Sequence, residues 1–284
     1  MNSLRIILVI LATTAQTLYS QTGSEIYLAD LEIKDDGITL SNSKNITNRI
    51  GYDNQPYFHP NKHLIYYSSF NDEERSDIKV YNYRNGKTEL FTKTKEREYS
   101  PTVTPDEKFI SCIIQRDDGA QDLGKYPIKG GQPVVIINNL IVGYHTWISS
   151  TKLALFVLGA PLTLRIYDLD TKKDSVITSS IGRSLHKIPY ENGFSYIDKS
   201  SAQWKINSWI DGKIEKIIET LPAREDITWT PDGKIITSDG RQFFFCDPKK
   251  GNPEWKMFYA SDIRGVSRLA VSADGKKIAF VVSE

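Results

Sequence analysis

The chain has 284 residues, of which 36 are Lys or Arg, 35 are Asp or Glu and only two are Cys. This balanced charge offers no electrostatic basis for binding nucleic acid or an anionic membrane surface, so nucleic acid is not expected as a partner. Cys112 and Cys246 stand in separate apolar runs and are too few for a disulfide framework, so we expect two small buried core residues.

Residues 1–20 have the layout of a secretory signal peptide. Arg5 supplies the positive charge, residues 6–15 form an apolar stretch, and Ser20 is a small residue before the expected cleavage site. A membrane-spanning helix needs about 20 apolar residues, and Gln16 interrupts this run after about half that length. Cleavage would leave 35 basic and 35 acidic residues, because Arg5 is the one charge removed. We therefore expect a periplasmic or secreted protein with no transmembrane segment after leader cleavage.

From residue 55 onward, the chain repeats a short strand, a tight turn and a second apolar strand. Clear copies start with QPYFHP at 55, SPTVTP at 100, ITWTPDG at 227 and RLAVSADG at 268, and weaker copies start at 144 and 184. The aligned turn positions are Pro60, Pro105, Ser149, Pro189, Pro231 and Ala273, spaced by 40 to 45 residues. Units of this length match a four-stranded blade of a β-propeller.

Each unit continues with a second pair of strands, such as residues 76–83 and 87–92 in the first unit. The last unit has only its first pair, and the missing pair is found at residues 24–33 and 37–47. We therefore predict an all-β, six-bladed β-propeller with four-stranded blades, in which N-terminal strands complete the C-terminal blade. Such closure leaves no unpaired edge within the ring. Residues 21–284 are expected to form this single domain.

The repeated turn resembles that of the TolB-type, WD-like propeller family, best in residues 230–234 (TPDGK) and 272–280 (SADGKKIAF). The resemblance covers essentially the whole chain after the leader. The segments GYDNQPYFHP, GYHTWIS, FVLG and IGRSLHKIP are also similar to an uncharacterised group of secreted propellers from Bacteroidetes. TolB carries an α/β domain before its propeller that has no counterpart here, so its envelope partnership is not carried over. The repeat specifies a fold, and this fold serves scaffolds, peptidases and lyases alike.

The residues that precede the inner strands of a propeller meet at one end of its central channel. In this sequence they are polar, charged and aromatic, as in small-molecule sites. We expect a small polar ligand or an envelope protein to bind at this channel mouth. The expected ligand-binding residues are Asp53, Gln55, Glu98, Tyr144, His145, Arg183, His186, Glu225, Asp226 and Arg268. The alternative is a structural network of ion pairs that closes the mouth.

Two histidines are candidates for chemistry. His145 and His186 begin the inner strands of adjacent units, so a lyase or hydrolase acting on a carbohydrate-like metabolite could use them as acid and base. Arg183 would then steady an anionic group. Two histidines without a third ligand predict no metal site, and no cofactor motif occurs. A purely structural envelope scaffold is the third hypothesis.

Overall fold

The computed structural model describes residues 23–35, 37–260 and 262–283, and every regular element within them is a β-strand. The expected signal peptide, residues 1–20, lies outside these described residues. No helix in the described part of the chain has the length and apolar character needed to cross a membrane.

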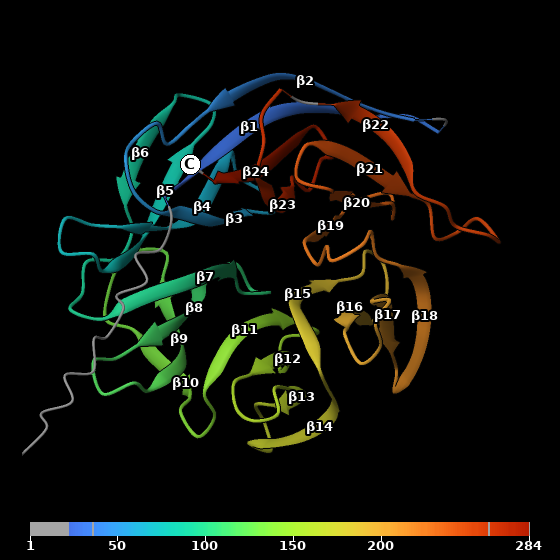
Figure 1. Ribbon diagram of the computed structural model, residues 1–284. Helices are drawn as coiled ribbons and strands as arrows, with labels where there is room; N and C mark the ends of the chain where they lie inside the picture. The colour runs from blue at the N-terminus through green and yellow to red at the C-terminus, as the bar shows by residue number, and fades with distance from the viewer. Residues whose placement is uncertain (1–22, 36, 261, 284) are drawn as a thin grey trace, which may run out of the picture.

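The strands form six antiparallel sheets of four strands each, arranged around a central axis (Figure 1). Blade 1 comprises β3 (Asp53–Phe58), β4 (Leu64–Phe70), β5 (Ser76–Asn82) and β6 (Lys87–Leu90). Blade 2 comprises β7 (Arg97–Val103), β8 (Phe109–Gln115), β9 (Gln121–Pro127) and β10 (Val134–Ile137). Blade 3 comprises β11 (Val142–Trp147), β12 (Lys152–Val157), β13 (Thr163–Asp168) and β14 (Lys173–Ser179).

Blade 4 comprises β15 (Ile181–Lys187), β16 (Gly193–Asp198), β17 (Lys205–Ile210) and β18 (Lys213–Glu219). Blade 5 comprises β19 (Ile227–Trp229), β20 (Ile235–Ser238), β21 (Gln242–Cys246) and β22 (Lys256–Ala260). Blade 6 comprises β23 (Val266–Val271), β24 (Lys277–Ser283), β1 (Ser24–Ile33) and β2 (Ile38–Asn45). The six inner strands β3, β7, β11, β15, β19 and β23 surround the centre of Figure 1. The predicted six-bladed propeller is confirmed.

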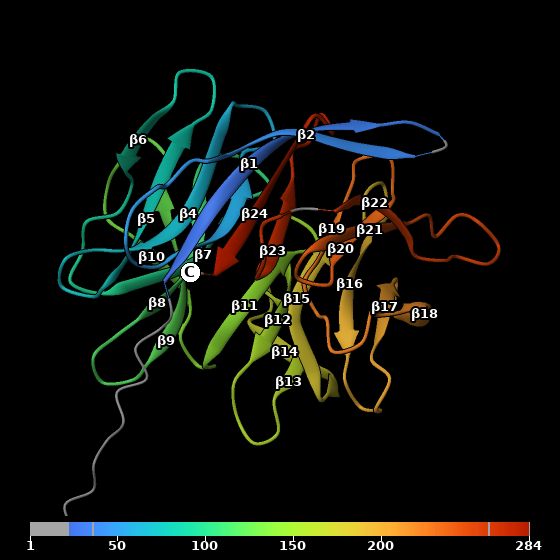
Figure 2. The same cartoon turned by 45° about the horizontal axis from the view of Figure 1, so that its top comes forward.

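Blade 6 joins the two ends of the chain. β1 pairs antiparallel with β24 from Ser24, opposite Ser283, to Asp30, opposite Lys277, and β2 forms the outer edge. Figure 2 shows β1 lying alongside β24, with β2 arching over it. Ile26 of β1 is fully buried in a cluster that includes residues of β4 in blade 1. The N-terminal strands therefore complete the C-terminal blade, as predicted.

Short turns between the first two strands of each blade define the far end of the channel. In the blade 6 turn, the Ser272 hydroxyl donates to Asp274 Oδ1 at 2.6 Å and accepts from the Lys277 N–H at 2.9 Å. Gly275 has a φ of +70°, a left-handed conformation that glycine adopts without steric cost. In blade 1, His59 takes the place of the hydroxyl residue, and its Nδ1 accepts from the Asn61 N–H at 3.1 Å. The local turn chemistry is therefore conserved across different side chains.

Apolar side chains fill the spaces between blades. Phe243 of blade 5 and Phe280 of blade 6 meet edge to face, with ring centroids 5.2 Å apart. Cys112 and Cys246 are free thiols with no exposed surface, as predicted. This packing holds the inner strands rigidly around the channel that they line.

Candidate functional site at the channel mouth

All six blades contribute residues to one cavity on the channel axis. The cavity has a volume of about 110 Å³ and is lined by residues of the inner strands or those just before them. Seven of the ten predicted ligand-binding residues line it: Gln55, Tyr144, His145, Arg183, His186, Asp226 and Arg268. The repeat thus brings together side chains that are more than 200 residues apart in the sequence.

β-Bulges direct polar side chains into this cavity. β3, β7 and β23 each have a register shift close to their N-terminal end. At these shifts Gln55, Ser100 and Arg268 have φ values of +57°, +55° and +41°. A non-glycine residue in this conformation costs about 1 kcal/mol or more. The Gln55 conformation is supported because its Oε1 accepts from the Ser100 N–H at 2.7 Å and from the Ser68 hydroxyl at 2.9 Å.

Two predicted residues, Asp53 and Glu98, lie away from the cavity. Asp53 is fully buried, with its Oδ2 3.0 Å from Nε of Arg49. Glu98 is also fully buried and accepts a hydrogen bond of 2.8 Å from the Tyr126 hydroxyl. Burial raises the pKa of both carboxyl groups. Both residues precede the bulge of their strand, which breaks the alternation that would otherwise point residues two apart to the same side.

Ion pairs cross the mouth between blades 4 and 5. Glu225 lies between Lys199 Nζ, at 2.9 Å, and Arg183 Nε, at 3.4 Å. Its Oε2 also accepts from the Arg183 main-chain N–H at 3.0 Å. Asp226 lies 3.5 Å from Arg183 Nη2. The ion-pair network considered from the sequence is therefore present, with Glu225 just behind the residues that line the cavity.

Arg268 extends this network to blade 6. Its Nε lies 3.7 Å from Asp226 Oδ1, and its Nη2 donates to the Tyr144 hydroxyl at 2.9 Å. The guanidinium also lies over the Tyr144 ring, 4.9 Å from the centroid, which gives a cation–π contact. The Arg268 side chain is only 15% exposed, so this charge is largely removed from bulk water.

The hydrogen bonds of His145 define its proton position. His145 Nε2 lies 2.8 Å from Ser111 Oγ, which also accepts from the Trp147 indole N–H at 2.9 Å and reaches the Thr102 carbonyl oxygen at 3.1 Å. An indole can only donate and a carbonyl can only accept, so all four groups are satisfied when His145 Nε2 carries the proton. Nδ1 is then a buried acceptor, and it has no partner among the described residues.

Both candidate catalytic histidines lie at the waist of the channel, midway between its mouth and its turn end. His145 and His186 line the mouth cavity and also a second cavity of about 330 Å³ that reaches the turn end. Burial lowers the pKa of His145 to about 3. Burial, with a smaller contribution from the charge of Arg268, lowers the pKa of His186 to about 4. Both imidazoles are therefore neutral at pH 7 and are weak bases, whereas general acid–base catalysis favours a pKa near the working pH.

The donor set at the waist does not fit a metal ion. Within the described residues, no group of three or more His, Cys, Asp or Glu side chains is close enough to hold one. Of the two imidazoles, His145 already has Nε2 engaged with Ser111. Protein metal sites commonly use at least three protein ligands.

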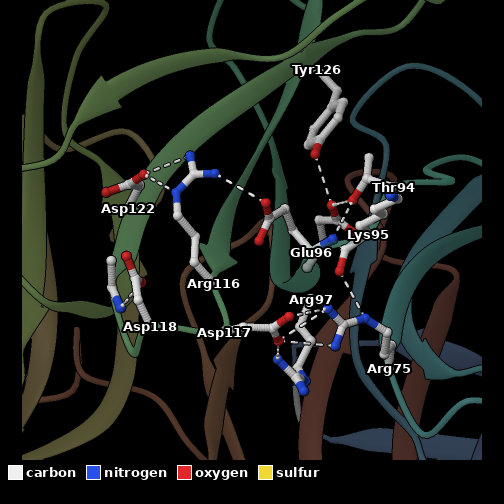
Figure 3. Close-up of polar contacts among 12 residues, drawn as sticks. Arg75, Thr94, Lys95, Glu96, Arg97, Arg116, Asp117, Asp118, Asp122 and Tyr126 are labelled. Atoms are coloured by element: carbon white, nitrogen blue, oxygen red, sulfur yellow. Dashed lines mark hydrogen bonds and ion pairs between the residues drawn. The ribbon is translucent and has the colours of Figure 1, made fainter.

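A second cluster of charges lies in the loops of blades 1 and 2 (Figure 3). Asp117 bridges two arginines, at 3.0 Å from Arg75 Nη2 and 2.8 Å from Arg97 Nη1. Arg116 contacts Asp122 at 2.8 Å and Glu96 at 3.2 Å. Because Arg75 belongs to blade 1 and Asp117 to blade 2, this cluster joins the two blades. Its three arginines are matched by three carboxylates among the residues in these ion pairs.

Comparisons with known proteins place this architecture among solved folds. No protein-family model and no curated protein sequence matches the chain significantly. A putative TolB from Agrobacterium tumefaciens matches with a TM-score of 0.68 and 14% identity, over 93% of this chain and 99% of that chain. The shared fold is a β-propeller. The Bacteroidetes resemblance stays a prediction.

Two further solved structures share the propeller. TolB from Acinetobacter baumannii matches with a TM-score of 0.57 and 15% identity, over 91% of this chain and 64% of that chain. An oligogalacturonate lyase in complex with manganese matches with a TM-score of 0.57 and 13% identity, over 85% of this chain and 79% of that chain. Identities this low establish a common fold and leave the function to the residues of the site.

Three residues outside the predicted set contribute to the site. Lys199 neutralises Glu225, Ser111 holds His145, and Ser100 has a buried Oγ without a partner among the described residues. Ser111 carries a sequence signal, because it is a polar residue within the apolar run FISCII. Ser100 also carries one, because it begins its copy of the repeat at the position of Gln55 and Arg268. Lys199 carries none, since its contact with Glu225 depends on the packing of blade 4 against blade 5.

Proposed function

We propose that this chain is an exported TolB-type propeller that binds a small polar ligand in the mouth cavity. The observation that carries this proposal is that two residues lining the cavity, Ser100 and His145, each hold a buried polar atom, Oγ and Nδ1, without a partner among the described residues. A buried polar group left unpaired costs about 1–3 kcal/mol. A polar ligand that pairs with both atoms would recover this cost on binding.

The depth of the polar groups favours a small ligand over a protein partner. His145 is 6% exposed, and the Arg268 side chain, which packs against the Tyr144 ring, is 15% exposed. A protein surface would have to insert a side chain into a cavity of about 110 Å³ to reach them. Export is supported by the leader-like composition of residues 1–20.

A binding screen on purified protein tests the proposal. Thermal shift and isothermal titration calorimetry would be run with small polar compounds grouped as anions, cations and neutral polyols. We expect at least one group to bind the native chain, and His145→Leu to weaken that binding at least about tenfold, because it removes a buried acceptor. His63→Leu is the matched control, since His63 is an exposed residue of a turn at the other end.

Failure of all three groups to bind the native chain would refute the proposal. So would equal loss of binding in the His63 and His145 variants, because the effect would then be unrelated to the cavity. Circular dichroism of each variant establishes that its fold is retained.

A further inference from the structure

The ion-pair network at the mouth has one more cation than anions. Its members among the described residues are the cations Arg183, Lys199 and Arg268 and the anions Glu225 and Asp226. The two histidines at the waist add no charge at pH 7, because burial lowers their pKa values to about 3 and about 4. An excess charge that is partly removed from water is unfavourable, and an anion in the cavity would relieve it.

Arg268 carries the positive charge that is paired most weakly in this network. Lys199 and the Arg183 main chain approach Glu225 to 2.9 and 3.0 Å, so that carboxylate is well engaged. Asp226 is shared between two guanidinium groups at 3.5 and 3.7 Å, whereas charge-assisted hydrogen bonds are about 2.7–2.9 Å long. The terminal donor of Arg268 is directed instead to the neutral hydroxyl of Tyr144.

A neighbouring residue of the cavity lining carries a buried hydrogen-bond acceptor. His145 follows Tyr144 in β11, and its unprotonated Nδ1 lacks a partner among the described residues. An anion that only accepts hydrogen bonds would satisfy Arg268 and leave this nitrogen unpaired. A hydroxyl group on the same molecule can donate to His145 Nδ1.

We infer that the ligand is a small hydroxy acid bound as a monoanion, with its carboxylate against Arg268 and its hydroxyl toward His145. This inference rests on the proposed function and names the chemical class of its ligand. The cavity of about 110 Å³ has room for a molecule of a few carbon atoms. A single carboxylate matches the excess of one positive charge, whereas a phosphate dianion would exceed it.

Calorimetry on the full chain at pH 7 tests the inference with glycerate, glycerol and propanoate. Glycerol lacks the carboxylate of glycerate, and propanoate lacks its hydroxyl groups. We expect each to bind at least about tenfold more weakly than glycerate, the effect of losing one hydrogen bond to a charged or buried group. Glycerol binding as tightly as glycerate, or inorganic phosphate binding more tightly, would overturn the inference and leave the proposed function standing. Absence of binding by anionic, cationic and neutral compounds alike would overturn both.

Two substitutions with opposite expected effects on glycerate binding extend the test. Arg268→Gln removes the guanidinium and should weaken glycerate binding at least about tenfold. Asp226→Asn removes the competing carboxylate and should tighten glycerate binding several-fold. Arg165→Gln is the control, because Arg165 is paired with Asp174 on the outer strands of blade 3 and should bind glycerate as the native chain does. If Arg268→Gln fails to fold, Asp226→Asn decides alone: unchanged or weaker glycerate binding in the folded variant overturns the inference.

Discussion

Closure of the ring through blade 6 predicts a large loss of stability when Ile26 is changed to Ala. Ile26 has no exposed surface and packs with blade 1 across the blade boundary. The substitution removes three carbon atoms, about 2.4 kcal/mol at 0.8 kcal/mol per buried CH₂ group, and the cavity left behind adds to this. We therefore expect the free energy of unfolding to fall by about 3–4 kcal/mol.

Urea denaturation followed by tryptophan fluorescence measures this loss. With a slope of about 3 kcal/mol per molar urea, the midpoint should fall by about 1 M. Ile214→Ala makes the same chemical change on the outer strand β18, where Ile214 is 46% exposed, and should cost less than about 1 kcal/mol. Equal effects of the two substitutions would refute the closure, because the N-terminal strands would then contribute no more than an exposed edge does.

Three further predictions concern buried groups. Burial raises the pKa of Glu98, so on acidification the folded protein binds a proton at Glu98 at a higher pH than the unfolded chain does. Lowering the pH from 7 should therefore stabilise the native chain relative to Glu98→Gln. The expected gain is at most about 1.4 kcal/mol per pH unit, measured by parallel urea titrations. Gly193→Ala should lower the free energy of unfolding by about 2 kcal/mol or more, because a Cβ at this position would lie 2.3 Å from a carbonyl oxygen of β17. Gly251→Ala is the control: a Cβ at Gly251 meets nothing within 4 Å, so the free energy of unfolding should not change in the same assay. Cys112 and Cys246 should resist a thiol reagent at pH 8 in the folded protein, because both are buried and burial raises the pKa of each thiol. Both should react in denaturant. Rapid labelling of either cysteine in the folded protein would contradict their buried placement.

The hydrogen bonds of His145 illustrate why the candidate site was only partly predictable. Its place on an inner strand follows from the repeat, and the structure puts it on the channel as expected. Its proton position depends on Ser111 and Trp147, which belong to two different blades. No local pattern in the sequence relates residues on neighbouring blades, because their contact follows from the packing of the ring.

The sequence by itself determined the blades of this protein. Each hairpin depends on a few adjacent residues, such as the hydroxyl, Asp and Gly of the 272–275 turn, and hydrogen bonds within such a turn form wherever the residues occur. The near-constant spacing of the turns then indicated six blades, and the strand pair at 24–45 completed the last of them.

Tertiary structure decided which of the predicted polar residues fail to reach the cavity. Strict alternation along a strand would put Asp53 with Gln55 and Glu98 with Ser100. The bulges instead turn the second member of each pair toward the channel and leave the first buried away from the cavity. A bulge at a non-glycine residue leaves no mark in the sequence, because its strained backbone is held in place by contacts from the neighbouring blade.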